Sequence, residues 1–149
     1  MGISIQQVYG LTETCGPACL MDGEGAIKRP ESTGKAFFHT EVKIVDDSGN
    51  DCPAGTAGEV LVRGEHIMTE YWNRPDATAE TLVDGWLRTG DVAMMDEEGY
   101  VSIQDRIKDM IISGGLNVYP KEVETYIDQI EGVNESAVIG LKDDDFGEK

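Results

Sequence analysis

Residues 9–14 read YGLTET, a string that combines an aromatic ring, a flexible glycine, two hydroxyls and a carboxylate. A loop of this kind can place the Tyr9 ring on a nucleobase, a threonine hydroxyl on a phosphate oxygen, and the carboxylate of Glu13 on Mg²⁺. Plain turns have the same composition just as often. The string taken alone therefore leaves a nucleotide loop and an ordinary turn both open.

Residues 88–91 read RTGD and follow a predicted strand. A carboxylate at Asp91 can accept hydrogen bonds from the two vicinal hydroxyls of a ribose, as acidic residues do in dinucleotide-binding folds. A turn that merely caps the next segment explains the glycine and the aspartate equally well.

Two further strings lie where the hydrophobic pattern changes. Residues 105–109 read DRIKD, which suits either a binding loop or an exposed strand end whose ion pairs are worth about 0–1 kcal/mol. Residues 113–115 read SGG, which allows a thin ligand or another backbone to approach closely but is also typical of a hairpin turn.

The elements that position these strings are mostly strands. Alternating polar and apolar residues predict strands over 41–45 and 59–63, and a hairpin in which 92–95 and 100–104 flank the turn 96–99. The region up to about Ile107 is therefore expected to be mainly antiparallel β. The acidic turn at 46–50 does not have the ligand spacing of an EF-hand, so calcium is not expected there.

Two segments have helical signals. Residues 75–82 offer Pro75 and an Asp76 able to cap free amides. Pro120 suits a first helical position, and four apolar residues follow it at i, i+3, i+4 and i+7 spacing, ending at Ile130. We expect Gly132 to end this helix and 136–141 to form a buried strand. The second unit then looks truncated at Lys149.

Charge, length and cysteine content limit the function classes. The 149 residues carry a net charge of −17, which disfavours binding to nucleic acid and to anionic lipid surfaces. No apolar run has the length of a membrane span, and the first residues resemble no signal peptide, so we expect a cytoplasmic protein. The three cysteines lack paired spacing and are interpreted as reduced structural thiols.

The order of the strings is far more specific than any one of them. It runs YGLTE (9–13), GEV (58–60), WLRTGD (86–91), DRIKD (105–109), and SGGLNVYPKEVE (113–124). This series resembles the AMP-forming adenylating superfamily, and within it the acyl-CoA synthetase branch of fatty-acid and aryl-acid CoA ligases. The resemblance covers essentially all 149 residues.

The resemblance implies roles for individual residues. Tyr9 would stack on adenine within a loop that closes over the nucleotide, Thr12 would bind the α-phosphate, and Glu13 would hold Mg²⁺. Asp91 would take the ribose hydroxyls, and Arg106 would assist there.

Further roles follow for the glycines and for the end of the β region. Gly10 would belong to the nucleotide loop. Lys108 would be the hinge about which a small C-terminal domain swings between adenylating and thioester-forming poses. Gly114 and Gly115 would then lie near the pantetheine arm of coenzyme A.

The resemblance also implies the fold and the reaction. The expected class is α+β, with residues 1–107 forming a distorted β-barrel-like subdomain of the large AMP-binding domain and 108–149 the start of the small lid domain. A carboxylic acid would attack the α-phosphorus of ATP with loss of pyrophosphate, and the thiol of coenzyme A would then attack the acyl-adenylate. Charge develops on oxygen in both steps, so fixed cations and hydrogen-bond donors should supply most of the acceleration.

Several family features are missing or altered. The phosphate loop that lies upstream in the family is absent, because the chain begins only eight residues before Tyr9. The lysine near the family's C-terminus that contacts the carboxylate and the α-phosphate is absent as well. Leu116 stands where many relatives have Glu, and Asp105 where many have Gly. The isolated chain is therefore expected to be inactive, and to pair with the missing portions where they are supplied.

Two alternatives remain open. One is a non-catalytic module that binds a nucleotide or a protein partner. The other keeps the fold and changes the acceptor, as in peptide-synthetase adenylation domains or luciferases; the strings at 111–120 favour a CoA ligase.

Overall fold

The computed structural model describes residue 3 and residues 5–149, and it divides into two compact units. The first unit ends at Ile103, and the second runs from Gln104 to Lys149. Each is built mainly from antiparallel strands with short helices, as the expected α+β class requires.

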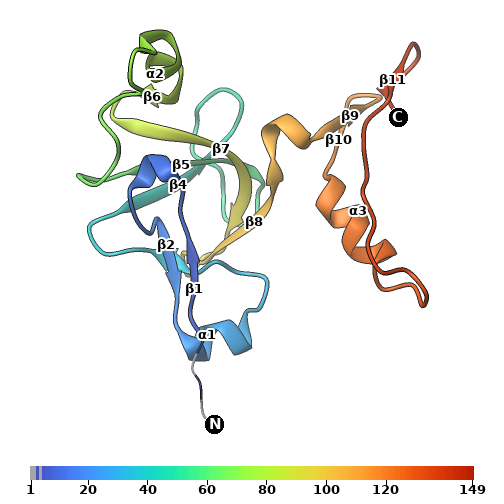
Figure 1. The fold of residues 1–149 in the computed structure, drawn as a ribbon, viewed down its shortest axis with the longest axis horizontal. Helices are drawn as coiled ribbons and strands as arrows, with labels where there is room; N and C mark the ends of the chain where they lie inside the picture. Colours follow the sequence, from blue (N-terminus) through green and yellow to red (C-terminus); the bar gives the residue numbers. More distant parts are fainter. Residues whose placement is uncertain (1–2, 4) are drawn as a thin grey trace. The chain divides into compact units, whose positions relative to one another are not determined.

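The main sheet of the first unit has five strands. It is ordered β4 (Glu41–Val45), β5 (Gly58–Arg63), β7 (Trp86–Met95), β6 (Leu82–Val83), with β8 (Val101–Arg106) also paired to β7. Figure 1 shows β5 and β7 side by side as long curved ribbons. Alternation in the sequence sets the buried face, because Ile44 of β4 and Val60 and Val62 of β5 all point into the core. The strands predicted over 41–45 and 59–63 are thus confirmed.

A second sheet lies at the start of the chain. It consists of β1 (Gln7–Tyr9), β2 (Cys19–Met21) and β3 (Lys35–Ala36), and α1 (Gly23–Lys28) connects the last two. The carboxylate of Asp22 accepts a hydrogen bond from the Gly25 N–H at 2.7 Å and so caps the first turn of α1.

One hydrophobic core joins the two sheets. Ala18 and Cys19 from the first sheet region pack with Val60, Ala93 and Val101 from the five-stranded sheet. Burial raises the pKa of the Cys19 thiol to about 12, so this cysteine is a protonated packing residue. The core holds the chain before β2 against the middle of β7, and this contact positions the site described below.

The helix α2 (Pro75–Thr81) forms where it was predicted, but it begins differently. Pro75 is its first residue and Arg74 occupies the cap position, where no side chain accepts a hydrogen bond from the helix. Asp76 therefore lies inside the first turn and is not the cap. Its negative charge still complements the positive end of the helix.

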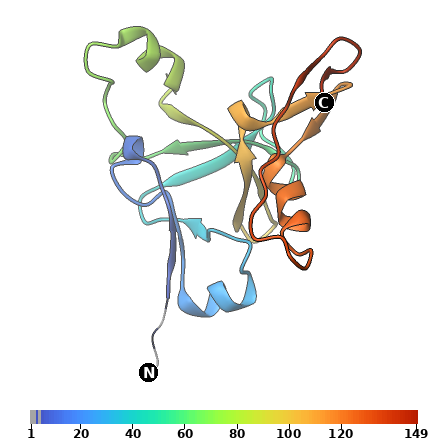
Figure 2. The same cartoon turned by 45° about the vertical axis from the view of Figure 1, so that its right-hand side comes forward.

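The second unit begins with a short helix and a strand pair. After η2 (Ile107–Asp109), β9 (Ile111–Ser113) pairs with β10 (Leu116–Val118), and α3 (Pro120–Ile127) follows. The strands β11 (Lys142–Asp143) and β12 (Gly147–Glu148) complete a sheet of order β10-β9-β12-β11. Figure 2 shows the segment after α3 returning alongside that helix.

Two expectations for this unit are wrong. The helix ends at Ile127, so Ile130 lies outside it, and residues 136–141 form no strand. Instead Val138 donates its N–H to the carboxylate of Glu124 on α3 at 3.0 Å, and Ile139 is 71% exposed. A buried strand needs neighbouring strands on its edges, and the segment runs beside a helix.

Among the described residues, no helix has the length and the apolar character needed to cross a membrane.

Candidate active site

The loop after β1 is held by one buried threonine. The Thr14 hydroxyl accepts the Leu11 N–H at 2.9 Å and lies 2.7 Å from the Gly16 carbonyl oxygen. This closes η1 (Thr12–Thr14), a single 3₁₀ turn in which Thr12 is exposed and Glu13 is half-buried. A Cβ on Gly10 would lie 2.5 Å from the same Gly16 oxygen, so the loop closes this tightly only with glycine there.

The RTGD string lies on a bulge of β7. Glu59 pairs with Val92 whereas Leu61 pairs with Arg88, so β7 carries two more residues than β5 across this interval. Gly90 has φ of +72°, a backbone conformation that suits glycine. Bulges redirect side chains at functional sites, and this one turns Asp91 into the molecule, where it is 5% exposed.

Glu59 on the neighbouring strand fixes the bulge. One of its carboxylate oxygens accepts the Arg88 Nε–H at 2.9 Å, with a second Arg88 nitrogen in close contact, and the other accepts the Gly90 N–H at 3.2 Å. The Thr89 hydroxyl donates to the Val60 carbonyl at 2.8 Å and accepts the Asp91 N–H at 3.1 Å. Every residue of the string is thereby tied to β5 or to its neighbour.

Tyr9 and Asp91 meet across 82 positions of the chain. The Tyr9 hydroxyl donates to Asp91 Oδ2 at 2.7 Å. Burial, and then the hydrogen bond and charge of Asp91, raise the pKa of the Tyr9 phenol well above its ordinary range. The phenol therefore stays protonated and remains a donor to the carboxylate at any physiological pH.

Glu13 is held from two sides by the segment between β5 and α2. The Tyr71 hydroxyl donates to Glu13 Oε1 at 2.6 Å, and the Met68 N–H donates to the Glu13 carbonyl at 2.8 Å. The hydrogen bond to Glu13 raises the pKa of Tyr71, with smaller contributions from burial and from the Glu13 charge.

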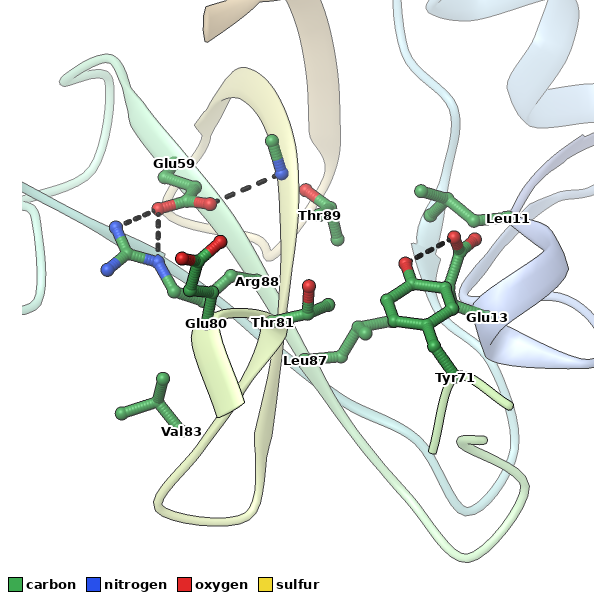
Figure 3. Close-up of a pocket in the computed structure, with 11 residues that line it drawn as sticks. Leu11, Glu13, Glu59, Tyr71, Glu80, Thr81, Val83, Leu87, Arg88 and Thr89 are labelled. Atoms are coloured by element: carbon green, nitrogen blue, oxygen red, sulfur yellow. Dashed lines mark hydrogen bonds and ion pairs between the residues drawn. The ribbon is translucent and has the colours of Figure 1, made fainter. Parts of the chain in front are cut away.

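A pocket of about 620 Å³ lies between the Glu13 turn and the bulge of β7, and neither Tyr9 nor Asp91 is among the residues that line it. Figure 3 shows Leu11, Glu13 and Tyr71 on one side and Glu59 and Arg88 on the other, with Thr89 and Leu87 between them. The volume is in the range of small-molecule sites, and both sequence-predicted strings contribute to the wall.

A metal ion at this site would receive most of its coordination from a bound substrate and from water, because the protein offers few ligands. Among the residues that the structure describes, no three His, Cys, Asp or Glu side chains gather closely enough to hold an ion. Glu13 uses Oε1 for Tyr71, so one carboxylate oxygen lies outside that bond. Mg²⁺ is commonly bound by one or two carboxylates together with substrate phosphates, and this donor set fits that mode.

The remaining predicted residues lie at the end of β8 and in the second unit. Arg106 is the last residue of β8 and is exposed, and Lys108 is an exposed residue of η2. Gly114 and Gly115 form the turn between β9 and β10. The Gly114 N–H donates to the Phe146 carbonyl at 2.9 Å. The turn interpretation of SGG is correct, and a role near a ligand stays a prediction.

Sequence reasoning missed Tyr71, Glu59 and Thr14. Tyr71 stands in a loop with no periodic pattern, and its partner is 58 positions away. Thr14 and Glu59 belong to strings that were already singled out, but an ordinary threonine or glutamate gives no sign of its hydrogen-bond partner. A buried strand position for Glu59 was the one available signal, since an ionised glutamate there needs a cation.

Comparison with known proteins agrees with this geometry. Residues 1–72 match the family model of the AMP-binding enzymes. A relative from Mycobacterium tuberculosis (strain CDC 1551 / Oshkosh), the long-chain-fatty-acid–CoA ligase FadD13, is 47% identical over 146 residues. That match covers 98% of this chain and 29% of FadD13.

The chain belongs to the AMP-binding enzyme family.

Solved structures of this family share its fold. o-Succinylbenzoate CoA synthetase (MenE) from Bacillus subtilis, in complex with the acyl-adenylate OSB-AMP, has a TM-score of 0.89 at 39% identity over 96% of this chain and 29% of that one. Another structure of MenE is in complex with ATP and magnesium ion. The amide bond synthetase McbA from Marinactinospora thermotolerans has a TM-score of 0.90 at 39% identity, covering 99% of this chain and 31% of its own.

Proposed function

We propose that this chain carries the adenosine- and magnesium-binding side of an ATP-dependent, AMP-forming acid–CoA ligase. Such an enzyme activates a carboxylic acid as an acyl-adenylate and transfers the acyl group to coenzyme A. The chain spans 29% of the length of FadD13, so the complete reaction requires further residues. The isolated chain is expected to lack turnover.

The observation that supports this most strongly is the hydrogen bond between Tyr9 and Asp91. It joins the two strings expected to hold adenosine, although 82 positions separate them. In this proposal Asp91 accepts the ribose hydroxyls while the Tyr9 hydroxyl keeps its carboxylate oriented. The Tyr9 ring faces the base, and Gly10 lets the loop approach the nucleotide.

Glu13 and Thr12 act on the phosphate side. Thr12 is exposed at the start of η1, where its hydroxyl is accessible to an α-phosphate oxygen. Glu13 would hold Mg²⁺ jointly with the phosphates, and the ion would stabilise charge that develops on the transferred group. The wall of the pocket also includes Arg88, whose charge is already paired with Glu59.

The second unit is assigned to the thioester-forming step. Arg106 assists at the ribose, and Lys108 is the hinge residue at the start of a mobile small domain. The turn at Gly114 and Gly115 approaches the pantetheine arm of coenzyme A. In a complete ligase, Lys108→Pro is expected to abolish thioester formation and to retain adenylation, because proline fixes φ. An equal loss of both half-reactions contradicts the hinge assignment.

The acid is proposed to approach through a different face of the first unit. A second pocket, of about 1020 Å³, includes Cys15, Gly16 and Pro17, the residues that directly follow the Glu13 turn, together with the Phe37 and Phe38 rings. Its walls combine apolar and polar groups. This lining favours an acid with an apolar or aromatic body.

A chimera tests the proposal. The segment of FadD13 that matches this chain is replaced by residues 1–149, and acid-dependent ATP–pyrophosphate exchange and acyl-CoA formation are measured. Both activities are expected. Asp91→Asn should lower kcat/KM for ATP by about tenfold to a hundredfold, the loss expected for hydrogen bonds to a charged group.

Asp47→Asn is the matched control, because Asp47 is an exposed residue of the 46–50 turn. It should leave exchange unchanged. A folded but inactive chimera, or equal effects of the two substitutions, contradicts the proposal.

Calorimetry on the 149-residue chain distinguishes the proposed function from the first alternative, a non-catalytic module that binds a nucleotide. AMP binding that Asp91→Asn removes supports a half-site that works alone, as a nucleotide-binding module requires. If the chain binds no AMP while the chimera is active, the result supports a segment that acts only as part of a complete ligase. Replacement of coenzyme A by amines in the chimera tests the other alternative, a changed acceptor, because the structurally similar McbA is an amide bond synthetase.

A further inference from the structure

We infer that Tyr71 is a positioning residue for Mg²⁺ binding: it holds the Glu13 carboxylate so that one oxygen is engaged and the other is presented to the ion. The inference rests on the proposed function, since it takes Glu13 as a metal ligand. It assigns a role to a segment, residues 64–74, that has none in the proposal above.

Two hydrogen bonds, from Tyr71 and from Met68, hold Glu13, and we call this pair of contacts the brace. The Tyr71 hydroxyl donates to Glu13 Oε1 at 2.6 Å, and the Met68 N–H donates to the Glu13 main-chain carbonyl at 2.8 Å. The first bond restrains the side chain and the second restrains the backbone of the same residue. Figure 3 shows the Tyr71 ring directed at the Glu13 carboxylate at the edge of the pocket.

The brace is anchored in α2. The Thr78 hydroxyl, in the first turns of that helix, accepts the Tyr71 N–H at 2.9 Å and donates to the Arg74 carbonyl at 2.9 Å. The Arg74 N–H in turn donates to the Tyr71 carbonyl at 3.0 Å. Both main-chain groups of Tyr71 are therefore satisfied, which fixes the position of its ring relative to the helix.

A free glutamate on an exposed turn samples several rotamers, and a metal ion must select one of them. A hydrogen bond to one carboxylate oxygen restricts the side chain in advance and leaves the second oxygen as a monodentate ligand. Groups that orient metal ligands in this way typically contribute about tenfold to a hundredfold in metal affinity. The alternative is that Tyr71 competes with the ion for Glu13, in which case its removal strengthens binding.

The bond itself is tested first, on the 149-residue chain. Tyrosines are labelled with ¹³C at the ring carbon that carries the hydroxyl, and their chemical shifts are recorded by NMR at neutral pH. This carbon responds to the hydrogen bond that the hydroxyl donates, so replacing the charged acceptor by Glu13→Gln should move the Tyr71 signal and leave that of Tyr126 in place. A Tyr71 signal that does not move overturns the brace.

The role is tested in the FadD13 chimera. Mn²⁺ binding in the presence of ATP is followed by electron paramagnetic resonance, and the Mg²⁺ dependence of ATP–pyrophosphate exchange is measured in parallel. Tyr71→Phe should raise both half-saturating concentrations about tenfold, and excess Mg²⁺ should restore the exchange rate. Tyr126→Phe is the matched control, since this ring is 70% exposed, and should change neither.

The outcomes separate this inference from the proposed function. An active wild-type chimera in which Tyr71→Phe leaves both half-saturations unchanged or lowers them overturns the positioning role alone. So does a loss of rate that excess Mg²⁺ does not restore, which indicates a purely structural tyrosine. A folded wild-type chimera without exchange overturns the proposed function and this inference with it.

Discussion

The two units of this chain contain similar apolar side chains but bury them to very different degrees. In the first unit Val60, Val62 and Val101 are fully buried. In residues 104–149, all of which the structure describes, only Ile111 and Pro120 are buried, and Leu116 is 72% exposed. The first unit is stabilised by a shared core, whereas the second depends on turns and local hydrogen bonds. An isolated helix as short as α3 is unstable in water, where about 12–15 residues are needed.

The largest expected difference comes from two glycines with nearly equal φ, Gly34 at +98° and Gly132 at +94°. A Cβ on Gly34 would lie 1.9 Å from the Leu20 carbonyl oxygen, whereas no atom lies within 4 Å of one on Gly132. Gly34→Ala should cost more than about 4 kcal/mol and unfold the first unit. Gly132→Ala should lower the free energy of unfolding by about 1–2 kcal/mol, the cost of a left-handed backbone conformation for alanine.

Urea denaturation followed by the fluorescence of Trp86, which lies in the first unit, measures the effect of Gly34→Ala, and amide hydrogen exchange of residues 122–127 measures the effect of Gly132→Ala in the second unit. Equal changes in the two variants would contradict the contrast between a packed and an open unit.

A matched pair of leucines gives the next effect. Leu87 is 1% exposed and Leu141 is 57% exposed. Leu87→Ala should destabilise by about 2–5 kcal/mol through lost burial and a cavity. Leu141→Ala should remain within about 0.5 kcal/mol, as surface changes do. Urea titrations followed by circular dichroism compare the two; a cost above 2 kcal/mol for Leu141→Ala would show a core in the second unit.

The difference in burial between the two units also explains which elements could be predicted from the sequence. Strands such as Glu41–Val45 follow from alternation, because one face of β4 meets a core that its own neighbours complete. Residues 136–141 were misassigned, because an apolar run has the same composition whether or not strands flank it. Whether an apolar residue is buried depends on the segments that pack against it, and the local sequence pattern does not specify those segments.

The candidate site also has a part that the sequence predicted and a part that it could not predict. Motif order pointed to Tyr9 and Asp91, and the structure brings their side chains to hydrogen-bonding distance. The pairs Tyr71 with Glu13 and Glu59 with Gly90 could not be predicted, since each joins residues on different elements. Such contacts depend on strand register and on a bulge, which are set by the packing of the whole first unit.

A local hydrogen bond of the second unit gives a smaller effect. Asp105 accepts the Lys121 N–H at 3.1 Å and so satisfies a free amide in the first turn of α3. Asp105→Ala should weaken α3 by about 1 kcal/mol, the usual value of a helix cap. Hydrogen exchange of residues 122–127 should then be about fivefold faster, a factor that corresponds to this energy. Asp105→Asn keeps an acceptor and should preserve most of the protection; equal losses would exclude the cap.

The smallest effect is a difference in how two aspartate turns respond to acid. The Lys149 ammonium, 2.7 Å away, and the N–H groups of Phe146 and Asp145 lower the pKa of Asp143 in the second unit. The N–H groups of Asn50 and Ser48 contribute to lowering the pKa of Asp46 in the first. Each carboxylate stabilises its turn above the ordinary aspartate pKa of about 3.9, and this stabilisation is lost as the pH falls through the lower folded value.

The expected difference lies in what remains after protonation. The Asp46 turn is closed by the antiparallel pairing of β4 with β5, five residue pairs long, whereas β11 and β12 share only two. Amide exchange should therefore show the 143–147 turn opening on acidification while 46–50 stays protected, and Asp143→Asn should open the former already at neutral pH without changing the fluorescence midpoint. Simultaneous opening of both turns would mean that the second unit unfolds together with the first, and that the two are not independently stabilised.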